Sequence, residues 1–495
     1  MPASQAHTPS SYAPVIAMVS GGSDSVALLM KLLKEPLDLL DGRGKALVER
    51  SRIHVLHINH KLREGDADED EAYVRELCTR FRLSCHVKTV DVRAYMCQIN
   101  ESNVELAARE VRYRLARELA YALADKAKIS HDDARILTAH TANDRAETFF
   151  MRAIEGASLS GLASIAQKQG IVVRPLLYHK RDELREYLNE LGIGWREDKT
   201  NEDVTLYRAF VRHKIIPLAL EKNPKFIENI SNSMDLIADE DTFMDTTSKD
   251  AYTFALEEQN EGFIALDSGK LVLLHTAIAR RVVREALTQI ASENARFSSR
   301  HISAALEGIH HRPFSVSLPG DIEVRREFDD LVFRNTTIEL DRAAHQVIRV
   351  PGKKDIGYLG TMTARVIEVP PQGDPMFLAT SLSIPYEKNP HFRPIIFDAD
   401  KAGITEEDLQ NGRAELLLCE AQNGDTIAPQ GMKEGTKLVM DVMAEARIPL
   451  RHRASIPLVK TKDGSQIVCI AGIRLDRAVE CSKNSTRLVE LSFQM

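Results

Sequence analysis

The first 180 residues alternate short runs rich in β-branched residues with segments whose apolar residues recur at helical spacing. The runs cover residues 15–19, 53–59, 84–92, 135–139 and 170–177, and the helical segments cover residues 25–33, 68–81, 104–127 and 143–154. Alternation of this kind predicts a parallel β-sheet with helices on both faces. Ligands of such sheets bind at the carboxyl ends of the strands. We therefore expect an α/β fold with its functional site at that edge.

The loop between the first predicted strand and the first predicted helix reads SGGSDS and spans residues 20–25. Gly21 and Gly22 let the backbone approach an anion closely. The positive end of the following helix and the serine hydroxyls favour phosphate further. The GK[ST] ending of a Walker A loop is missing. Asp24 beside a phosphate indicates a bridging Mg²⁺ ion, and a plain glycine turn with serine caps is the alternative.

The composition excludes several classes of protein. No stretch approaches the roughly 18 uninterrupted apolar residues that a transmembrane helix needs, so we expect no membrane partner. The six cysteines include no CxxC pair, which argues against a disulfide framework and a thiolate metal site. The N-terminus lacks the basic start and apolar core of a signal peptide. Together these features predict a cytoplasmic protein.

The charge is unevenly distributed. The formal net charge is −7, which disfavours a nucleic-acid-binding surface over the whole chain. Residues 270–312 nevertheless carry seven Lys and Arg against three acids. This basic window is a candidate nucleic-acid face, and a solvated pair of helices is the alternative.

The chain is too long for one hydrophobic core, so we expect several domains. Residues 1–220 form the expected catalytic α/β domain. A central, mainly helical domain is expected at 221–345, and it ends in a β-hairpin at 315–335, where strand-like alternation flanks Pro319-Gly320. A connecting segment at 346–410 and a small α+β domain at 411–495 complete the prediction.

The SGGSDS loop resembles the PP-loop of the N-type ATP pyrophosphatases, which split ATP between its α and β phosphates and adenylate a substrate oxygen. Further segments resemble motifs of the tRNA(Ile)-lysidine synthetases and follow that family's order over nearly the whole chain. They are HINHKLR (57–63), ELAAREVRYRL (105–115), TAHTANDRAETFFMRAIEGASLSGL (138–162), RPLL (174–177), WREDKTNEDVTLYRAFVRHKIIP (195–217) and NGDTIAPQGMKEGTKLVMDVMAEARIPLRHRASIPLV (423–459).

Four positions depart from the family pattern. The residues found there are Lys61 in place of glycine, Arg145 in place of glutamine, Ala209 in place of asparagine and Thr426 in place of arginine. Each departure puts the local role of that position in question, while the order of the motifs is kept.

The resemblance implies a ligase that forms a carbon–nitrogen bond. ATP adenylates the wobble cytidine of tRNA(Ile) with a CAU anticodon, and the ε-amine of free L-lysine then displaces AMP to give lysidine. The implied cofactors are ATP and Mg²⁺, with Asp24 as the metal ligand. The residues expected to bind ATP are Ser20, Gly21, Gly22, Ser23, Asp24, Ser25, His57 and Asn59.

The residues expected to be catalytic are Asp24, Arg112, Asp144, Glu147 and Arg208. Asp144 and Glu147 lie three residues apart at a predicted helix start and so share one face. They are suited to hold the lysine ammonium group, to bind metal or to accept a proton, and a helix N-terminal charge pattern is the alternative. Arg112 is expected to stabilise the adenylate phosphate. Arg208 suits phosphate or the tRNA backbone.

The tRNA backbone is expected to contact the basic window and the C-terminal domain, because such contacts bind without reading sequence. The residues expected to bind it are Arg212, Arg280, Arg281, Arg284, Lys437, Arg447 and Arg453. An ordinary solvated face is the alternative for each of these side chains.

Two other functions stay open. A PP-loop tRNA thiolase needs a catalytic cysteine or an iron–sulfur site, and the cysteine spacing here gives no support to either. A tRNA-binding relative without catalysis is the second alternative, raised by the residues at positions 145 and 209. The sequence also leaves the oligomeric state open, a homodimer included.

Overall fold

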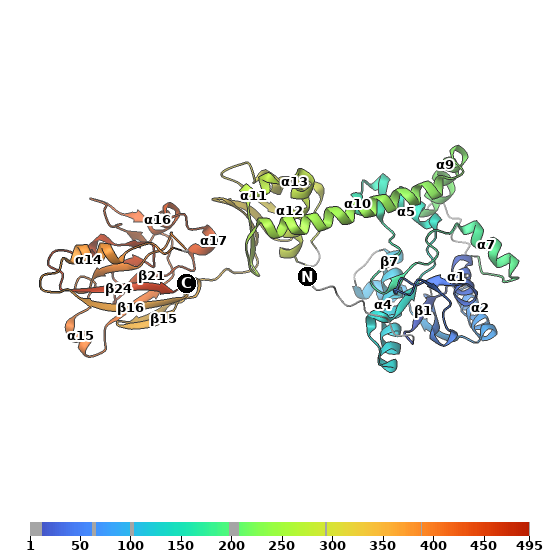
Figure 1. Ribbon diagram of the computed structural model, residues 1–495, viewed down its shortest axis with the longest axis horizontal. Helices are drawn as coiled ribbons and strands as arrows, with labels where there is room; N and C mark the ends of the chain where they lie inside the picture. The colour runs from blue at the N-terminus through green and yellow to red at the C-terminus, as the bar shows by residue number, and fades with distance from the viewer. Residues whose placement is uncertain are drawn as a thin grey trace. The chain divides into compact units, whose positions relative to one another are not determined.

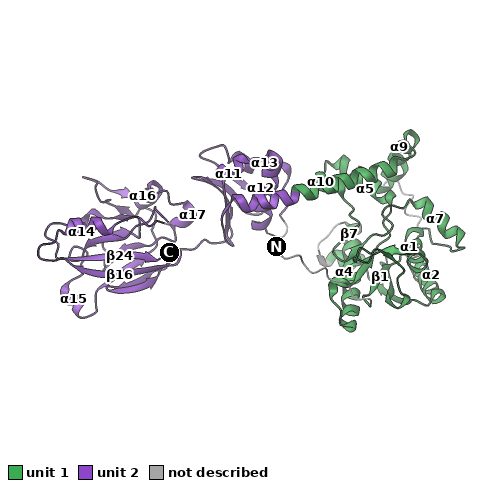
Figure 2. Ribbon diagram, in the orientation of Figure 1, with its two compact units in different colours: residues 1–244 green, residues 245–495 purple. Residues whose placement is uncertain are grey.

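The computed structural model describes residues 12–61, 66–99, 103–197, 207–292, 295–387 and 389–494. The chain divides into two compact units, residues 1–244 and 245–495, which are green and purple in Figure 2. The boundary falls inside a long helix rather than at residue 220, where the sequence pattern changes. Unit 1 contains the predicted catalytic domain, and unit 2 contains the rest.

Unit 1 is built on a six-stranded sheet of order β5-β4-β1-β6-β8-β7, in which every neighbouring pair is parallel except β7 and β8. Its strands are β1 (Val15–Met18), β4 (Ile53–Asn59), β5 (Ser84–Thr89), β6 (Arg135–Leu137), β7 (Lys168–Gln169) and β8 (Val172–Val173), with β2 (Leu37–Asp38) and β3 (Lys45–Ala46) as a separate pair. The predicted parallel sheet is confirmed.

Four of the five predicted strands are shorter in the structure, two of them by three or more residues. The run at 84–92 ends at Thr89, because Asp91 accepts a hydrogen bond from the N–H of Ala94 (3.0 Å) and so starts a helix that the sequence reading missed. The run at 170–177 yields only β8. Pro175 follows closely and has no N–H to donate to a neighbouring strand.

Helices cover both faces of this sheet (Figure 1). The residues of β1 alternate, so that Val15 and Ala17 pack in one core with residues of α1, α2 and α7, while Ile16 and Met18 pack with residues of α4. The helices of this part of the chain are α1 (Ser23–Lys34), α2 (Asp66–Phe81), α3 (Val92–Ile99), α4 (Val104–Ala127), α5 (Ala142–Glu155), α6 (Leu159–Ala163), α7 (Arg181–Glu190), α8 (Tyr207–Phe210), a π-helical turn (Val211–Ile215), α9 (Ile216–Lys222) and α10 (Phe226–Ala255).

The first part of unit 2 is helical, as expected, and also contains a five-stranded antiparallel sheet of order β11-β12-β13-β10-β9. The hairpin predicted around Pro319-Gly320 is confirmed, with Gly320 at φ +80°. The elements are β9 (Leu256–Gln259), β10 (Phe263–Asp267), α11 (Ser268–Leu273), α12 (Thr276–Ile290), α13 (Ser299–Glu307), β11 (Ser315–Leu318), β12 (Ile322–Glu327) and β13 (Asp330–Asn335).

The last part of unit 2 has two larger sheets, of order β14-β18-β21-β22-β23 and β15-β16-β24-β17, and a two-stranded pair, β19 and β20. The strands are β14 (Gln346–Arg349), β15 (Gly352–Asp355), β16 (Thr361–Glu368), β17 (Ile395–Asp398), β18 (Glu415–Cys419), β19 (Thr426–Ile427), β20 (Lys437–Leu438), β21 (Leu458–Lys460), β22 (Ile467–Ile470), β23 (Arg474–Leu475) and β24 (Arg487–Gln494). The helices are α14 (Pro375–Leu382), α15 (Glu406–Gln410), α16 (Val439–Glu445) and α17 (Leu450–Arg453).

The prediction of a connecting segment at 346–410 was wrong. Strand β24 pairs with β16 on one side and with β17 on the other, and both partners come from that segment. Met362 and Phe397 are buried in the same hydrophobic core as Leu491. The spaced prolines and glycines of the segment mark turns between these strands rather than a linker.

A buried arginine joins the two parts of unit 2. Arg451 of α17 donates to Glu258 (3.1 Å), and it also bonds Glu327 (3.1 Å) and Asp330 (2.7 Å) of the five-stranded sheet. His452 Nε2 lies 2.8 Å from the same Glu258 carboxylate. Three carboxylates around one guanidinium compensate the cost of its burial.

Among the described residues, no helix combines the length and the apolar character that crossing a membrane requires.

Candidate active site

The loop after β1 has the geometry of an anion cradle. Gly21 has φ +100°, a conformation that favours glycine. Ser25 Oγ accepts a hydrogen bond from the N–H of Ser20 (3.1 Å) and donates to the carbonyl of Gly22 (2.9 Å), which closes the loop. Helix α1 begins at Ser23, and its N-cap, Gly22, has no side chain to cap the first turn. The amides of that turn are therefore available to an anion.

Three carboxylates from two helices converge on one guanidinium group beside this loop. Arg181, the first residue of α7, lies with Nε 3.1 Å from Asp24 Oδ2 of α1. Its Nη2 lies 3.3 Å from Asp144 Oδ1, and its Nη1 lies 3.4 Å from Glu147 Oε1, both on α5. The structure therefore brings the predicted carboxylates Asp24, Asp144 and Glu147 together.

Two further arginines complete this carboxylate–arginine cluster. Arg208 bonds Asp144 Oδ1 and Glu147 Oε2, each at 2.8 Å. Arg212 makes a bidentate pair with Glu147, with distances of 2.7 and 3.0 Å. The two arginines lie four residues apart and reach one site, as their spacing predicted. Only 1% of the Glu147 side chain is exposed, so its charge depends on these partners.

The start of α5 fixes the direction of the Asp144 carboxylate. Thr141 is the N-cap, and it forms a capping box with Asp144. Asp144 Oδ2 accepts from both the N–H and the hydroxyl of Thr141 (2.8 Å each). Its Oδ1 is left for Arg181 and Arg208. Oδ2 of Asp144 therefore serves the helix start, as the alternative for this pair stated, and Oδ1 belongs to the carboxylate–arginine cluster.

Burial and charge act differently on the two aspartates. Burial raises the pKa of Asp24 above its usual value, and Arg181 only partly offsets this effect. Burial also opposes ionisation of Asp144, but Arg208 and Arg181 outweigh it and hold the pKa of Asp144 below its usual value. Asp144 is therefore ionised at neutral pH and attracts cations.

Two histidines near the strand ends, His60 and His140, are neutral at neutral pH. Burial, then the charge of Arg112, lowers the pKa of His60 to about 4. Burial also lowers the pKa of His140 to about 4, although Asp144 acts in the opposite direction. His57 is buried, and its Nδ1 lies 2.9 Å from the carbonyl of Val19, at the start of the phosphate loop. The structure places Arg112 on α4 beside His60.

The amide of Asn59, predicted to contact ATP, is used within the fold. Its Nδ2 donates to Asp68 (2.9 Å) and Glu71 (3.2 Å) of α2, and its Oδ1 accepts from the N–H of Lys61 (3.1 Å). Asn59 thus anchors the acidic start of α2 to the end of β4. Its contact with ATP stays a prediction.

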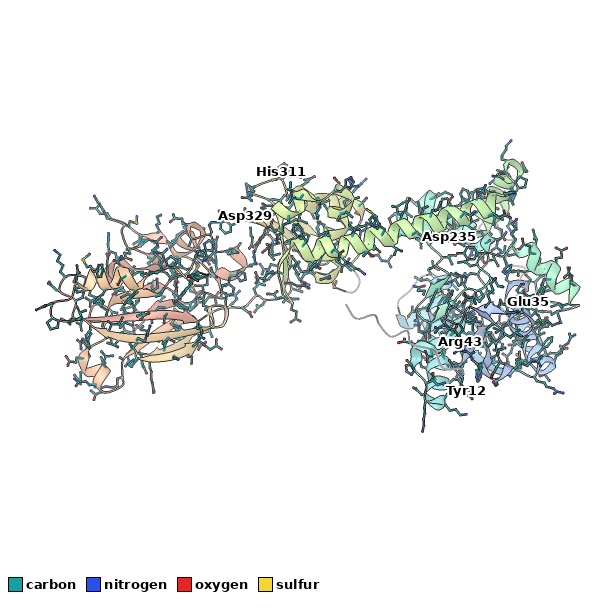
Figure 3. All side chains as sticks on the ribbon, in the orientation of Figure 1. Tyr12, Glu35, Arg43, Asp235, His311 and Asp329 are labelled. Atoms are coloured by element: carbon teal, nitrogen blue, oxygen red, sulfur yellow. The ribbon has the colours of Figure 1, made fainter. Side chains whose placement is uncertain are left out.

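Two departures from the family pattern have visible consequences. Lys61 has φ +49°, in the left-handed region, which explains why a glycine is usual there. Arg145 is only 2% exposed and bonds Asp235 of α10 at 2.7 Å. The Tyr178 hydroxyl donates to the same aspartate (3.3 Å), which is labelled in Figure 3. Arg145 therefore ties α5 to α10. Ala209 is buried and Thr426 exposed, and nothing in the structure explains either departure.

The residues predicted to bind tRNA fall into two groups. Arg280 and Arg284 are exposed on α12. The other five bond to groups within the protein. Arg212 belongs to the carboxylate–arginine cluster, and three more form ion pairs: Arg281 with Asp245, Lys437 with Glu445 and Arg447 with Asp329. Arg453 donates to the carbonyls of Ile448 and Met440. Arg453 has the clearest structural role, because its bonds hold the turn before α17.

Sequence reasoning missed Arg181, whose guanidinium contacts all three carboxylates. The signal was its place four residues after the RPLL motif, at the start of a charged helix. Arg63, Asp198 and Asn201, which also belong to the family-like motifs, lie outside the described residues.

The carboxylates of Asp24 and Asp144 suit a Mg²⁺ ion only if phosphate oxygens complete its coordination. In the part of the chain that the structure describes, no group of three or more His, Cys, Asp or Glu is placed to hold a metal. Asp24 and Asp144 share Arg181, and the charge of Asp144 adds to the effect of burial in raising the pKa of Asp24. Mg²⁺ is commonly held by one or two carboxylates plus substrate phosphates. Asp24 and Asp144 supply such a donor set at the phosphate loop.

Comparison with known proteins agrees with the fold described above. A family model described as a PP-loop domain matches residues 3–219, and one described as a TilS substrate C-terminal domain matches residues 416–491. The parallel sheet and the phosphate loop therefore define a PP-loop ATPase.

Relatives that match nearly the whole chain indicate which PP-loop family it belongs to. A tRNA(Ile)-lysidine synthase from Caldanaerobacter subterraneus subsp. tengcongensis is 26% identical, covering 97% of this chain and 93% of the relative. Those of Clostridium perfringens strain 13 and Clostridioides difficile strain 630 are 29% and 25% identical, each covering 97% of this chain and 95% of the relative. The chain belongs to the tRNA(Ile)-lysidine synthetase family.

Proposed function

We propose that this protein joins free L-lysine to the wobble cytidine of tRNA(Ile) with a CAU anticodon, with cleavage of ATP to AMP and pyrophosphate. One observation carries the proposal: the carboxylate–arginine cluster lies beside the phosphate loop. Its members are Asp24, Asp144, Glu147, Arg181, Arg208 and Arg212. Such a site holds an anion and a cation next to each other, which this reaction requires. Its proposed place of action is the cytoplasm, where tRNA occurs.

The first half-reaction requires that the protein bind the triphosphate of ATP and neutralise its negative charge. The amides of the first turn of α1 and the hydroxyls of the loop bind the phosphates. Mg²⁺, held by Asp24 and Asp144, would offset the negative charge that develops on pyrophosphate. Arg181 now occupies the place between these carboxylates, so we propose that its guanidinium turns to phosphate when the cation enters.

The second half-reaction needs a lysine ε-amine without its extra proton. An ammonium group of this kind has a pKa near 10.4. Asp144 and Glu147 attract it, and a neighbouring basic group accepts the proton as the amine attacks carbon 2 of the adenylated cytosine. The electron pair of the carbon–oxygen bond leaves with AMP. Arg208, and Arg112 beside His60, are proposed to balance the charge of the leaving phosphate.

The decisive assay is incorporation of radiolabelled lysine into tRNA transcripts. We expect ATP-dependent label on the CAU-anticodon tRNA(Ile) transcript and none on the CAU-anticodon tRNA(Met) transcript. Asp24→Ala is expected to abolish pyrophosphate release while tRNA binding persists. Absence of label on both transcripts, with ATP and tRNA bound, would refute the proposal.

We further propose that the exposed pair Arg280 and Arg284 of α12 contacts the tRNA backbone. The double charge reversal to glutamate is expected to weaken tRNA binding and to lower the slope of log K against log salt by about 1 to 2. Reversal of Arg281, which is paired with Asp245, is the matched control and should change this slope less. An unchanged slope in the double variant would mean that this face of α12 is an ordinary solvated surface that does not contact tRNA.

A further inference from the structure

The backbone segment Gly194–Arg196 crosses the phosphate loop. The N–H of Arg196 donates to the carbonyl of Gly21 at 2.9 Å. A Cβ added at Gly21 would lie 3.6 Å from Arg196 Cγ and 3.7 Å from Tyr73 Cδ1, so both side chains cover this glycine. We call this segment the strap.

The strap is fixed at three points besides Gly21. The Tyr73 hydroxyl of α2 donates to the carbonyl of Gly194. The guanidinium of Arg196 pairs with Glu69 and, at 3.2 Å, with Asp70 of the same helix. Trp195 packs against the hydrophobic core beneath α1 and α2. The acidic start of α2 thus serves as the anchor of the strap.

The peptide between Gly21 and Gly22 needs such an anchor. Neither residue has a Cβ, so this peptide can rotate at low steric cost. In one orientation the Gly22 N–H faces the phosphate loop, where it donates a long hydrogen bond to Ser20 Oγ (3.5 Å) that an anion can replace. In the other orientation the Gly21 carbonyl takes the place of this N–H and repels an anion. The bond from Arg196 N–H engages the Gly21 carbonyl and so selects the first orientation.

We propose that the strap holds the phosphate loop in its anion-binding conformation, with Arg196 and Tyr73 as positioning residues for ATP. This inference rests on the proposed use of ATP at the loop. Arg196 acts through its backbone N–H, and its guanidinium and Tyr73 keep that N–H in place. Neither side chain is assigned a role in the transfer of lysine.

The test measures the dissociation constant of MgATP by calorimetry on the full chain. Arg196→Ala frees the guanidinium anchor and Tyr73→Phe removes the hydroxyl anchor, while the backbone N–H stays in both. We expect each variant to bind ATP about threefold to tenfold more weakly, the factor that one hydrogen bond of ordinary net strength produces. Arg196→Lys keeps one ion pair and is expected to recover part of the affinity.

A matched control is Arg185→Ala, which removes an exposed arginine from α7 and should leave the ATP affinity unchanged. The Tyr73→Phe, Arg196→Ala double variant should lose less than the product of the two single losses, because both act on one segment. Lower thermal stability with unchanged ATP affinity in both single variants would overturn the inference.

The outcome is separable from that of the proposed function. If the wild-type chain makes no lysidine but the variants show the expected losses of ATP affinity, the strap is confirmed and the lysine reaction is not. If lysidine forms and the variants bind ATP as tightly as the wild type, the strap is refuted and the reaction stands.

Discussion

Replacing Arg181 by methionine tests the carboxylate–arginine cluster directly. The change keeps most of the aliphatic volume and removes one guanidinium from contact with Asp24, Asp144 and Glu147, at 3.1 to 3.4 Å. Breaking a buried ion pair by removing one partner costs about 3–5 kcal/mol. Since Arg208 and Arg212 remain on the two α5 carboxylates, we expect the lower end, about 3 kcal/mol.

The assay is thermal unfolding with and without MgCl₂. For a unit of this size, 1 kcal/mol shifts the midpoint by about 2–4 °C, so Arg181→Met should unfold about 6–12 °C below the wild type. If Asp24 and Asp144 hold Mg²⁺ as proposed, the ion would take the place of the lost guanidinium in the variant. At ten times its dissociation constant it should return about 1.4 kcal/mol of stability, whereas in the wild type it competes with Arg181 and returns less.

Two results would refute this reasoning. A midpoint within about 1 °C of the Arg185→Met control would mean that Arg181 does not compensate the carboxylates in solution. If Arg181→Met loses the expected stability and Mg²⁺ restores none of it, Asp24 and Asp144 do not form a cation site.

Four further outcomes are expected. Glu147→Gln keeps the side-chain shape but removes the charge that faces three arginines, so lysine incorporation should fall at least about 100-fold with circular dichroism unchanged. Cys78→Ser should leave incorporation nearly unchanged, because burial and then Cys85 raise the pKa of the Cys78 thiol to about 12 and it carries no thiolate at neutral pH; lost activity in a folded variant would favour thiolation. Arg451→Met should destabilise unit 2 by about 3 kcal/mol in urea unfolding, and no change would refute the buried joint. The pKa of Asp144 is lowered in the folded state, so this group contributes stability above its unfolded pKa, and the urea midpoint of unit 1 should fall as the pH drops below about 4. In Arg181→Met this fall should be smaller, because loss of the guanidinium raises the folded-state pKa of Asp144 toward its unfolded value.

Local patterns predicted the elements that depend on local physics. Strand β4 and helix α4 have the predicted ends, because an apolar run and an amphipathic repeat each end abruptly in the sequence. The pair Asp144 and Glu147 was predicted because the segment at 138–162 resembles a family motif, and its spacing of three residues placed both carboxylates on one helical face. Residues a few positions apart were enough for the two elements, whereas the carboxylate pair also needed the motif.

Tertiary contacts decided the rest. Arg181 lies 157 residues from Asp24 in the chain, and its surroundings, RDELREYL, look like those of any charged surface helix. Residues 346–410 looked like a linker because the partners that bury β16 and β17 lie about 100 residues further on. Pairing at such separation leaves no periodic trace in either segment alone.

The position of β24 has a consequence for the order of events during synthesis. This strand spans Arg487–Gln494, near the end of the chain, and it lies between β16 and β17 in its sheet. The strand β17 ends nearly 90 residues before β24 begins, so during synthesis β16 has one open edge, and β17 lacks the strand that it pairs with, until β24 has left the ribosome. A truncation that removes the whole of Arg487–Gln494 would leave the edges of β16 and β17 that face β24 unpaired and prone to aggregation.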